Sequence, residues 1–285
     1  MIKYNKGENM KINWFPGHMT KTLKDIQEKL KNVDVIIYVL DARIPLSSLN
    51  PKLNSLAQNK PTLYVFNKSD MADKEKLQNI CPKFKKDECD YVVLNSTLSG
   101  ASKVIVSKVK VLASAKIEKY RAKGIKPTIR CMVIGVPNSG KSTLVNNLCG
   151  KVKAVTGNRP GVTRVGQWLS IGDCIEIYDT PGTLYPNLQN QDIAKKLALL
   201  GSIKDEVVDT FELAQEGIKI MLKLYPENMQ QRFPNCVNLE DIAKHRGFYI
   251  SKGELDIDRA SSAFIDDLRK GRIGNITLDW YEEIK

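Results

Sequence analysis

The stretch GVPNSGKS, from Gly135 to Ser142, combines residues that can hold a chain of phosphates. It matches the pattern G-x-x-x-x-G-K-[ST] and lies between the apolar run CMVI and the helix-forming TLVNNL. Glycines in such a turn let backbone N–H groups approach phosphate oxygens, and the N-terminus of the following helix adds positive potential. Lys141 would reach the β- and γ-phosphates, and the Ser142 hydroxyl would bind Mg²⁺. The predicted nucleotide contacts of this P-loop are Asn138, Ser139, Gly140, Lys141, Ser142 and Thr143.

Two later stretches add groups that a site for Mg²⁺ and a γ-phosphate needs. DTPG, from Asp179 to Gly182, follows the apolar run CIEIY. Asp179 would hold a water molecule of the Mg²⁺ shell, and the Gly182 N–H would face the γ-phosphate. Thr163 lies in RPGVTR, between the P-loop helix and DTPG, where it would close on Mg²⁺ when the γ-phosphate is present. The order of these stretches is typical of a pair of nucleotide-sensing switch loops.

A fourth stretch, YVFNKSD, could select the base. Guanine presents its N1–H and N2–H₂ donors together on one edge, so the Asp70 carboxylate could accept both, whereas adenine has no such pair. Asn67 would tie the base-binding loops together and contact the opposite edge of guanine. The stem of Lys68 would lie along the face of the ring. These residues favour GTP over ATP, although their stretch precedes the P-loop rather than following it.

The elements that must position these residues alternate along the first two-thirds of the chain. A helical pattern at HMTKTLKDIQEKL leads into the apolar run VDVIIYVL, and further short apolar runs are separated by helical stretches at 99–123 and 141–149. This alternation predicts an α/β fold with a mainly parallel sheet covered by helices on both faces. Beyond Pro186 the patterns indicate short helices at 190–200, 205–223, 238–245 and 255–269. We therefore predict an α/β domain over 1–187 and a small all-helical domain over 188–285.

Charge and composition limit the location and the partners. The net charge of +12 is concentrated before residue 195, because residues 195–285 hold 14 Lys and Arg against 16 Asp and Glu. Residues 74–130 carry 14 basic against 5 acidic residues, a density that suits a polyanion or, equally, a solvated helical face. No stretch is apolar enough to cross a membrane, and the six scattered cysteines contain no C-x-x-C pair. We expect a cytoplasmic protein with free thiols, no membrane partner and a monomeric state.

Six stretches together resemble the YlqF/RbgA family of circularly permuted ribosome-biogenesis GTPases. They are WFPGHM (14–19), DARIPLSSLNP (41–51), NKSD, GVPNSGKS, NRPGVTR and DTPGTLYP, and the resemblance covers essentially the whole chain. It implies a permuted P-loop GTPase domain followed by a helical domain that contacts RNA or the ribosome. It also implies assembly of the large ribosomal subunit, with GTP binding promoting association and hydrolysis permitting release. The expected partners are the large subunit or its precursor, through rRNA and ribosomal proteins.

Several expectations depend on details of this resemblance. The family's second base-contacting loop commonly reads Ser-Ala, and the matching residues here are Asn95, Ser96 and Thr97, of which Ser96 and Thr97 are the candidate guanine contacts. Thr183 stands where Ras-like enzymes have the glutamine that orients water. The resemblance implies that His18 of WFPGHM orients the water instead, beside Lys141 and Thr163 as catalytic residues.

The same comparison suggests a second cation. Several GTPases without the glutamine bind K⁺ beside the phosphates, and Asn138 would supply an oxygen ligand here. Hydrolysis of GTP to GDP and phosphate should be slow without a partner, and the large subunit is the expected activator.

Two other functions remain open from the sequence. The chain could be an RNA-binding protein in which guanine nucleotide is a structural ligand with little turnover, a function that the basic residues 74–130 would suit. It could also be a P-loop kinase or ATPase, which NKSD disfavours. A turnover assay distinguishes the first from a GTPase, and competition between ATP and GTP tests the second.

Overall fold

The computed structural model describes residue 12 and residues 18–150, 167–184 and 190–279, with only the backbone of residues 18–20. The chain forms two compact units. One, which we call the sheet unit, comprises 16–186 together with 274–285, and the other, the helical unit, comprises 1–15 and 187–273.

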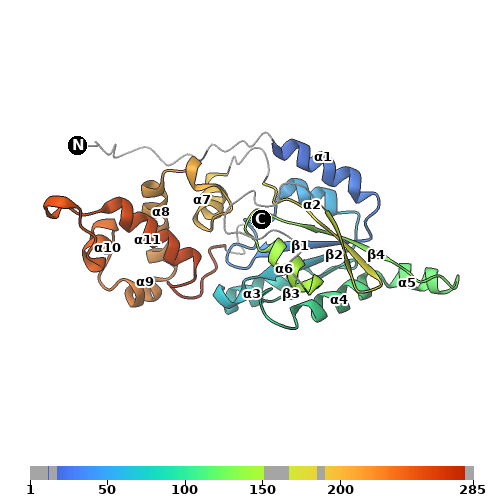
Figure 1. Ribbon diagram of the computed structural model, residues 1–285. Coiled ribbons are helices and arrows are strands. Elements are labelled where there is room, and N and C mark those ends of the chain that lie inside the picture. The colour runs from blue at the N-terminus through green and yellow to red at the C-terminus, as the bar shows by residue number, and fades with distance from the viewer. Residues whose placement is uncertain (1–11, 13–17, 151–166, 185–189, 280–285) are drawn as a thin grey trace. The chain divides into compact units, whose positions relative to one another are not determined.

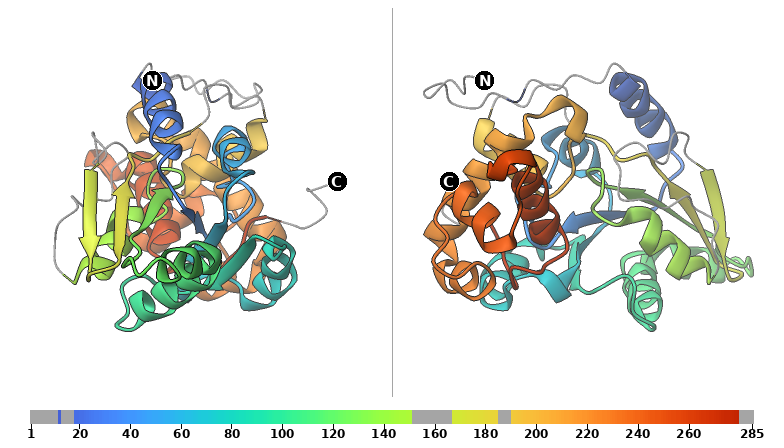
Figure 2. Two further views of the ribbon diagram at one scale, coloured as in Figure 1. Left: turned by 90° about the vertical axis from the view of Figure 1, so that its right-hand side faces the viewer. Right: turned by 60° about the vertical axis from the view of Figure 1, so that its left-hand side comes forward.

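The sheet unit is built on six strands in the order β3-β2-β1-β4-β6-β5. All neighbouring pairs are parallel except β5 and β6, and β5 lies at one edge of the sheet (Figure 2). The central strand, β1, is buried along its whole length, because helices cover both faces of the sheet. The strands are β1 (Val35–Asp41), β2 (Thr62–Asn67), β3 (Cys89–Val93), β4 (Ile129–Ile134), β5 (Gln167–Ile171) and β6 (Ile175–Asp179).

Helices pack on this sheet through two clusters of buried hydrophobic side chains, one on each face. Figure 1 shows these helices beside the strands. On one face, Ile37 and Val133 pack with Ile105 and Leu144 from the helices α4 (Ala101–Leu112) and α6 (Lys141–Cys149), and α5 (Ser114–Arg121) follows α4. The other face is covered by α1 (His18–Leu30), α2 (Pro51–Ala57) and α3 (Lys74–Ile80), with the short 3₁₀ turns η1 (Ser69–Met71) and η2 (Cys81–Phe84) nearby in the chain. The predicted α/β architecture is confirmed.

The carboxyl ends of the central strands bring the four motifs to one edge of the sheet. Asp41 and Asn67 are register partners at the ends of β1 and β2, and the P-loop follows β4 directly. Asp179 ends β6, opposite Val133 of β4. Parallel strands place their carboxyl ends together whatever their order in the chain, so a guanine motif that precedes the P-loop still reaches it.

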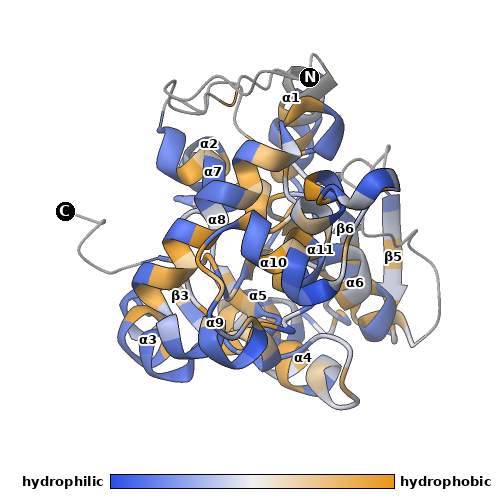
Figure 3. Ribbon diagram, turned by 90° about the vertical axis from the view of Figure 1, so that its left-hand side faces the viewer, coloured by the Kyte–Doolittle hydropathy of each residue, from blue (hydrophilic) through white to orange (hydrophobic). Residues whose placement is uncertain are grey.

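The helical unit contains α7 (Gln191–Leu199), α8 (Thr210–Leu224), α9 (Pro226–Arg232), α10 (Leu239–Arg246) and α11 (Ile257–Arg269), with 3₁₀ turns η3 (Asp205–Val207) and η4 (Ser251–Gly253). Side chains of Asn or Asp cap the N-termini of four of these helices, at Asn190, Asp209, Asn238 and Asp256. A Cβ atom at Gly217 would lie 2.8 Å from the Phe264 ring, so α8 and α11 pack closely there. Figure 3 shows hydrophobic and hydrophilic stretches alternating along these helices.

The C-terminal residues differ from the prediction. The sequence predicted one helical domain over 188–285, but residues 274–279 form no helix and belong to the sheet unit. Their backbone N–H groups bond to loops of that unit, with Ile276 donating to Met71 and Leu278 to Arg43. All six cysteines are free, and no helix in the described ranges is long and apolar enough to span a membrane.

Candidate nucleotide-binding site

The P-loop packs so tightly against its neighbours that two of its glycines have no room for a side chain. A Cβ atom at Gly135 would lie 2.3 Å from the Val39 carbonyl oxygen, and one at Gly140 would lie 2.1 Å from Nδ2 of Asn67. Both glycines have positive φ, as does Asn138 at 58°. The helix α6 begins at Lys141, immediately after the loop, so its N-terminus faces the predicted phosphate position.

Lys141 is held inside this loop. Its side chain is buried, and Nζ donates a hydrogen bond of 2.8 Å to the Val136 carbonyl. Burial lowers the pKa of Lys141 to about 8, a shift that the nearby Asp179 carboxylate reduces and Lys68 increases. The ammonium is therefore poorly solvated. The negative charge of a polyphosphate bound beside it would stabilise it in place of water.

Asp179 provides an unsatisfied anionic group next to this cation. The residue is fully buried, and neither carboxylate oxygen has a hydrogen-bond partner within the part of the chain that the structure describes. Burial raises its pKa to about 6, although the Lys141 ammonium lowers it in part. Hard oxygen donors are the ligands that Mg²⁺ prefers, so the carboxylate of Asp179 and the hydroxyl of Ser142 fit this ion. Thr163, the third predicted Mg²⁺ residue, lies outside the described residues.

The DTPG segment closes against the P-loop. A Cβ atom at Gly182 would lie 2.6 Å from Cα of Pro137 and 3.0 Å from Nζ of Lys141, so only glycine fits there. Thr183 is fully buried, with its N–H bonded to the Gly135 carbonyl at 3.1 Å and its hydroxyl bonded to the Pro181 carbonyl at 3.0 Å. Its hydroxyl is thus engaged within the segment and is not a substitute for the missing glutamine.

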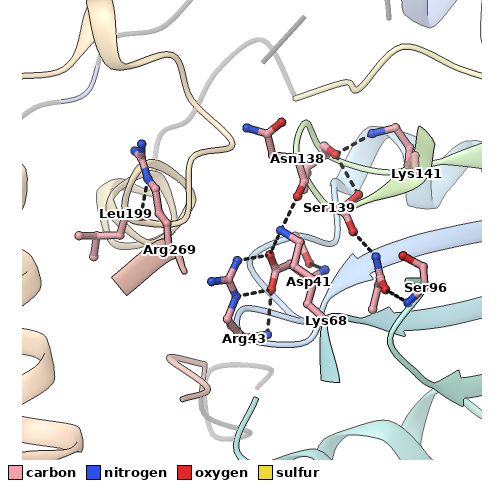
Figure 4. Close-up of polar contacts among 12 residues, drawn as sticks. Asp41, Arg43, Lys68, Ser96, Asn138, Ser139, Lys141, Leu199 and Arg269 are labelled. Atoms are coloured by element: carbon pink, nitrogen blue, oxygen red, sulfur yellow. Dashed lines mark hydrogen bonds and ion pairs between the residues drawn. The ribbon is translucent and has the colours of Figure 1, made fainter. Parts of the chain in front are cut away.

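Asn67 joins the base loop to the phosphate loop. Its Nδ2 donates 2.9 Å to the Ser139 carbonyl, and its Oδ1 accepts 2.9 Å from the Ser96 N–H (Figure 4). Asp70 lies just beyond, exposed on the turn η1. The predicted tie between loops is present, and the Asp70 carboxylate is open to a ligand.

The loop that contains the other candidate base contacts is fixed by its own residues and by α6. Ser96 is buried, while Thr97 is exposed and bonds to the Asn95 side chain through both its N–H and its hydroxyl. Nδ2 of Asn147 donates to the carbonyls of Ser96 and Leu98 at 3.0 and 3.1 Å. The sequence did not single out Asn147, because an asparagine in a helix carries no signal of a partner 51 positions away.

Comparison with known proteins agrees with this geometry. Ribosome biogenesis GTPase A of Bacillus cereus is 40% identical over 282 residues, which are 96% of this chain and 95% of that protein. This chain belongs to the ribosome biogenesis GTPase A family. Residues 130–235 of this chain match the family model described as 50S ribosome-binding GTPase.

Two solved structures of a YlqF protein resemble this family member over nearly their whole length. A GDP-bound YlqF structure has a TM-score of 0.68 at 27% identity, covering 90% of this chain and 99% of that one. A GNP-bound YlqF structure from T. maritima has a TM-score of 0.66 at 26% identity, covering 91% and 97%.

A buried ionic cluster beside the base loop was not predicted as part of the site. Arg43 binds both oxygens of Asp41, through Nε at 3.0 Å and Nη2 at 2.8 Å, and both side chains are almost fully buried. Nζ of Lys68 contacts Asp41 at 2.8 Å and donates to the Asn138 carbonyl at 2.5 Å (Figure 4). Burial alone would raise the pKa of Asp41, but Arg43 and Lys68 outweigh it and hold that pKa well below its usual range. In this family member, Asp41 therefore anchors the lysine of NKSD to the P-loop.

We expect Asp41→Asn to destabilise the protein by about 3–5 kcal/mol, because it leaves the Arg43 and Lys68 cations without their buried counter-charge. Urea denaturation of the nucleotide-free protein measures this effect. Asp173→Asn is the matched control, because its pair with Lys126 is largely exposed and should contribute less than about 1 kcal/mol. Equal stabilities of the two variants would show that the cluster is not an important anchor.

Two predicted catalytic residues stay untested by this geometry. The backbone of His18 begins α1, but its side chain, like the whole of Thr163, is outside the described residues.

Proposed function

We propose that this protein hydrolyses GTP to GDP and phosphate and acts in assembly of the large ribosomal subunit, associating with it in a nucleotide-dependent manner. The observation that supports guanine nucleotide binding most directly is the bridge from Asn67 to Ser139, which joins the loop of Asp70 to the P-loop. The name of the Bacillus cereus relative, Ribosome biogenesis GTPase A, and the description of the matching family model, 50S ribosome-binding GTPase, support the ribosomal role.

In this proposal each loop has a separate task. The Asp70 carboxylate accepts both donors on one edge of guanine, and the stem of Lys68 lies along the ring. The backbone of Ser96 and Thr97 contacts the base as well. The P-loop amides and Lys141 hold the phosphates. The phosphate contacts come from Asn138 to Thr143 and from the Gly182 N–H.

The carboxylate of Asp179 and the hydroxyls of Ser142 and Thr163 would hold Mg²⁺. Bound there, this ion neutralises charge on the β- and γ-phosphate oxygens. Asp179 is suited to that task because it is a buried carboxylate whose oxygens lack hydrogen bonds from described residues. Lys141 stabilises the negative charge that develops on the oxygen between the β- and γ-phosphates as water attacks the γ-phosphate.

Water orientation is the step for which the chain lacks the Ras-like residue. Thr183 is buried, with its hydroxyl bonded to Pro181, so it leaves that task to another group. We propose that His18 performs it when a partner positions the segment around it. Intrinsic turnover should therefore be slow and should rise on the large subunit.

The test is phosphate release from GTP by the purified protein, with and without large ribosomal subunits. We expect acceleration of at least about a hundredfold by the subunits, and loss of most of that acceleration in His18→Ala with GTP affinity retained. Nucleotide binding without phosphate release under either condition would instead favour the structural-ligand function.

The same assay in K⁺ and in Na⁺ tests the role proposed for Asn138. Its backbone carbonyl accepts a hydrogen bond from Lys68, so we assign the K⁺ ligand to the side-chain oxygen. We propose faster hydrolysis in K⁺, and equal rates in the two salts would remove this role.

A further inference from the structure

The last described residues of the chain, Gly274–Asp279, form what we call the C-terminal strap. They follow Ile273, the final residue of the helical unit, and pack within the sheet unit. Four consecutive strap residues are almost completely buried: Ile276, Thr277, Leu278 and Asp279 are each no more than 1% exposed. Segments outside helices and strands ordinarily run over the protein surface, so burial of this extent indicates that the strap is fixed by specific contacts.

The strap bonds directly to the segment that carries Asp70. The Ile276 N–H donates 3.0 Å to the carbonyl of Met71, the residue after Asp70. The Thr277 hydroxyl accepts 3.2 Å from the Asp73 N–H and donates 3.1 Å to the Ala42 carbonyl. One hydroxyl thus joins the segment after NKSD to the end of β1.

The strap also fixes the loop that follows β1. The Leu278 N–H donates 2.7 Å to the Arg43 carbonyl. The Asp279 carboxylate accepts 2.8 Å from each N–H of Leu46 and Ser47, and 2.6 Å from the Ser47 hydroxyl. This loop contains Arg43, which binds the Asp41 carboxylate that anchors Lys68, so the strap supports NKSD from two sides.

The turn that carries Asp70 has little support of its own. η1 is three residues long and begins after Lys68, whose φ is 60°. Within the sheet unit its backbone is held by bonds such as Ser69 N–H to Leu94 carbonyl, at 3.2 Å. A carboxylate that must meet two donors at once needs a fixed backbone, because a displacement of a fraction of an ångström weakens both bonds.

We propose that the strap is a positioning element of the guanine-specificity site, with the Thr277 hydroxyl fixing the segment that presents Asp70. This inference rests on the proposed guanine recognition by Asp70. It makes base selection depend on residues more than 200 positions away, at the point where the chain leaves the helical unit.

A positioning role and a purely structural role predict different nucleotide affinities. Inosine diphosphate has the phosphates, the ribose and the N1–H of GDP, but it lacks the 2-amino group that Asp70 would also bind. If the strap only stabilised the fold, its loss would weaken the binding of both nucleotides equally. If it positions Asp70, its loss weakens GDP binding more, and the ratio of the two affinities falls.

The experiment measures dissociation constants for GDP and inosine diphosphate in the wild type, Thr277→Val and Thr277→Ser. We expect the preference for GDP to fall by about fivefold or more in Thr277→Val, which is the loss expected for about one net hydrogen bond, and to be retained in Thr277→Ser. Thr62→Val is the matched control. Thr62 is an equally buried threonine at the start of β2, whereas NKSD lies at the end of that strand. Its preference should equal that of the wild type.

Thr277→Ala removes the same hydroxyl without placing a methyl group against the Asp73 N–H, and it replaces the valine variant if that protein does not fold. An unchanged preference in the hydroxyl-free variant, or a loss that serine does not restore, overturns the positioning role. Absence of any preference for GDP in the wild type would instead overturn the proposed guanine recognition, so the two failures are distinguishable.

Discussion

Asp70→Asn should lower the affinity for GDP and GTP by at least about a hundredfold. Hydrogen bonds to a charged acceptor contribute roughly 1.5–3 kcal/mol each, and the neutral amide can accept from only one of the two guanine donors while its own N–H₂ faces the other. The same change should raise the affinity for xanthine nucleotides. Xanthine has a carbonyl where guanine has its 2-amino group, so the amide N–H₂ of asparagine can donate to it while the amide oxygen accepts the N1–H. The largest expected effect is therefore an inversion of base preference.

Competition binding with guanine and xanthine diphosphates measures this inversion without the complication of hydrolysis. Because Asp70 is exposed, the variant should fold as the wild type does. Asp87→Asn is a suitable control, since it makes the same change of charge at another exposed position of the sheet unit. A variant that still prefers guanine would show that another group selects the base.

The phosphate and base motifs could be predicted because each consists of neighbouring residues in a recognisable context. GVPNSGKS needs only a preceding strand and a following helix, both visible as patterns in the sequence. The mainly parallel sheet with helices on both faces could be predicted in a similar way, since strands buried on both faces are continuous apolar runs.

Other parts of the site depend on residues that meet only in the folded chain. Asp41 is an acidic residue at the end of a strand. Nothing in the sequence around it reveals that Lys68, 27 positions later, will bind it. The Thr277 hydroxyl meets the Ala42 carbonyl across 235 positions. Such contacts leave no periodicity and no local motif, which is why the strap was assigned to the helical domain.

Short helices were also missed for a physical reason. α2, α3 and α9 have seven residues each, two turns of helix, over which a 3.6-residue hydrophobic period is hard to distinguish from chance. Their starts are nevertheless encoded, with Asn50 and Asp73 capping α2 and α3 and Pro226 opening α9. The stretch predicted as one helix over 99–123 is interrupted at Ala113, where the backbone leaves the helical conformation between α4 and α5.

Asp179→Asn should separate two effects of the buried carboxylate: the loss of folding stability when it ionises, and its binding of Mg²⁺. Because burial raises the pKa of Asp179 to about 6 from 3.8, the folded state holds this proton more tightly than the unfolded state. The stability that this proton contributes is complete below pH 3.8 and is lost as the pH rises through 6. The contribution of this group to stability should therefore be about 2 kcal/mol smaller at pH 7 than at pH 4, a difference that Asp179→Asn should largely remove.

Mg²⁺ and nucleotide should reverse the comparison between the two proteins. A cation that binds the ionised carboxylate only in the folded state stabilises the wild type at pH 7, and protons should weaken its binding about tenfold per pH unit below 6. Asp179→Asn should gain much less stability from Mg²⁺ with GTP, and its Mg²⁺-dependent phosphate release should fall by at least about a hundredfold. Urea denaturation at pH 4 and 7, with and without Mg²⁺ and nucleotide, provides all four comparisons. If the stabilities of the variant and the wild type respond equally to pH and to Mg²⁺, then the Asp179 carboxylate does not bind the metal ion.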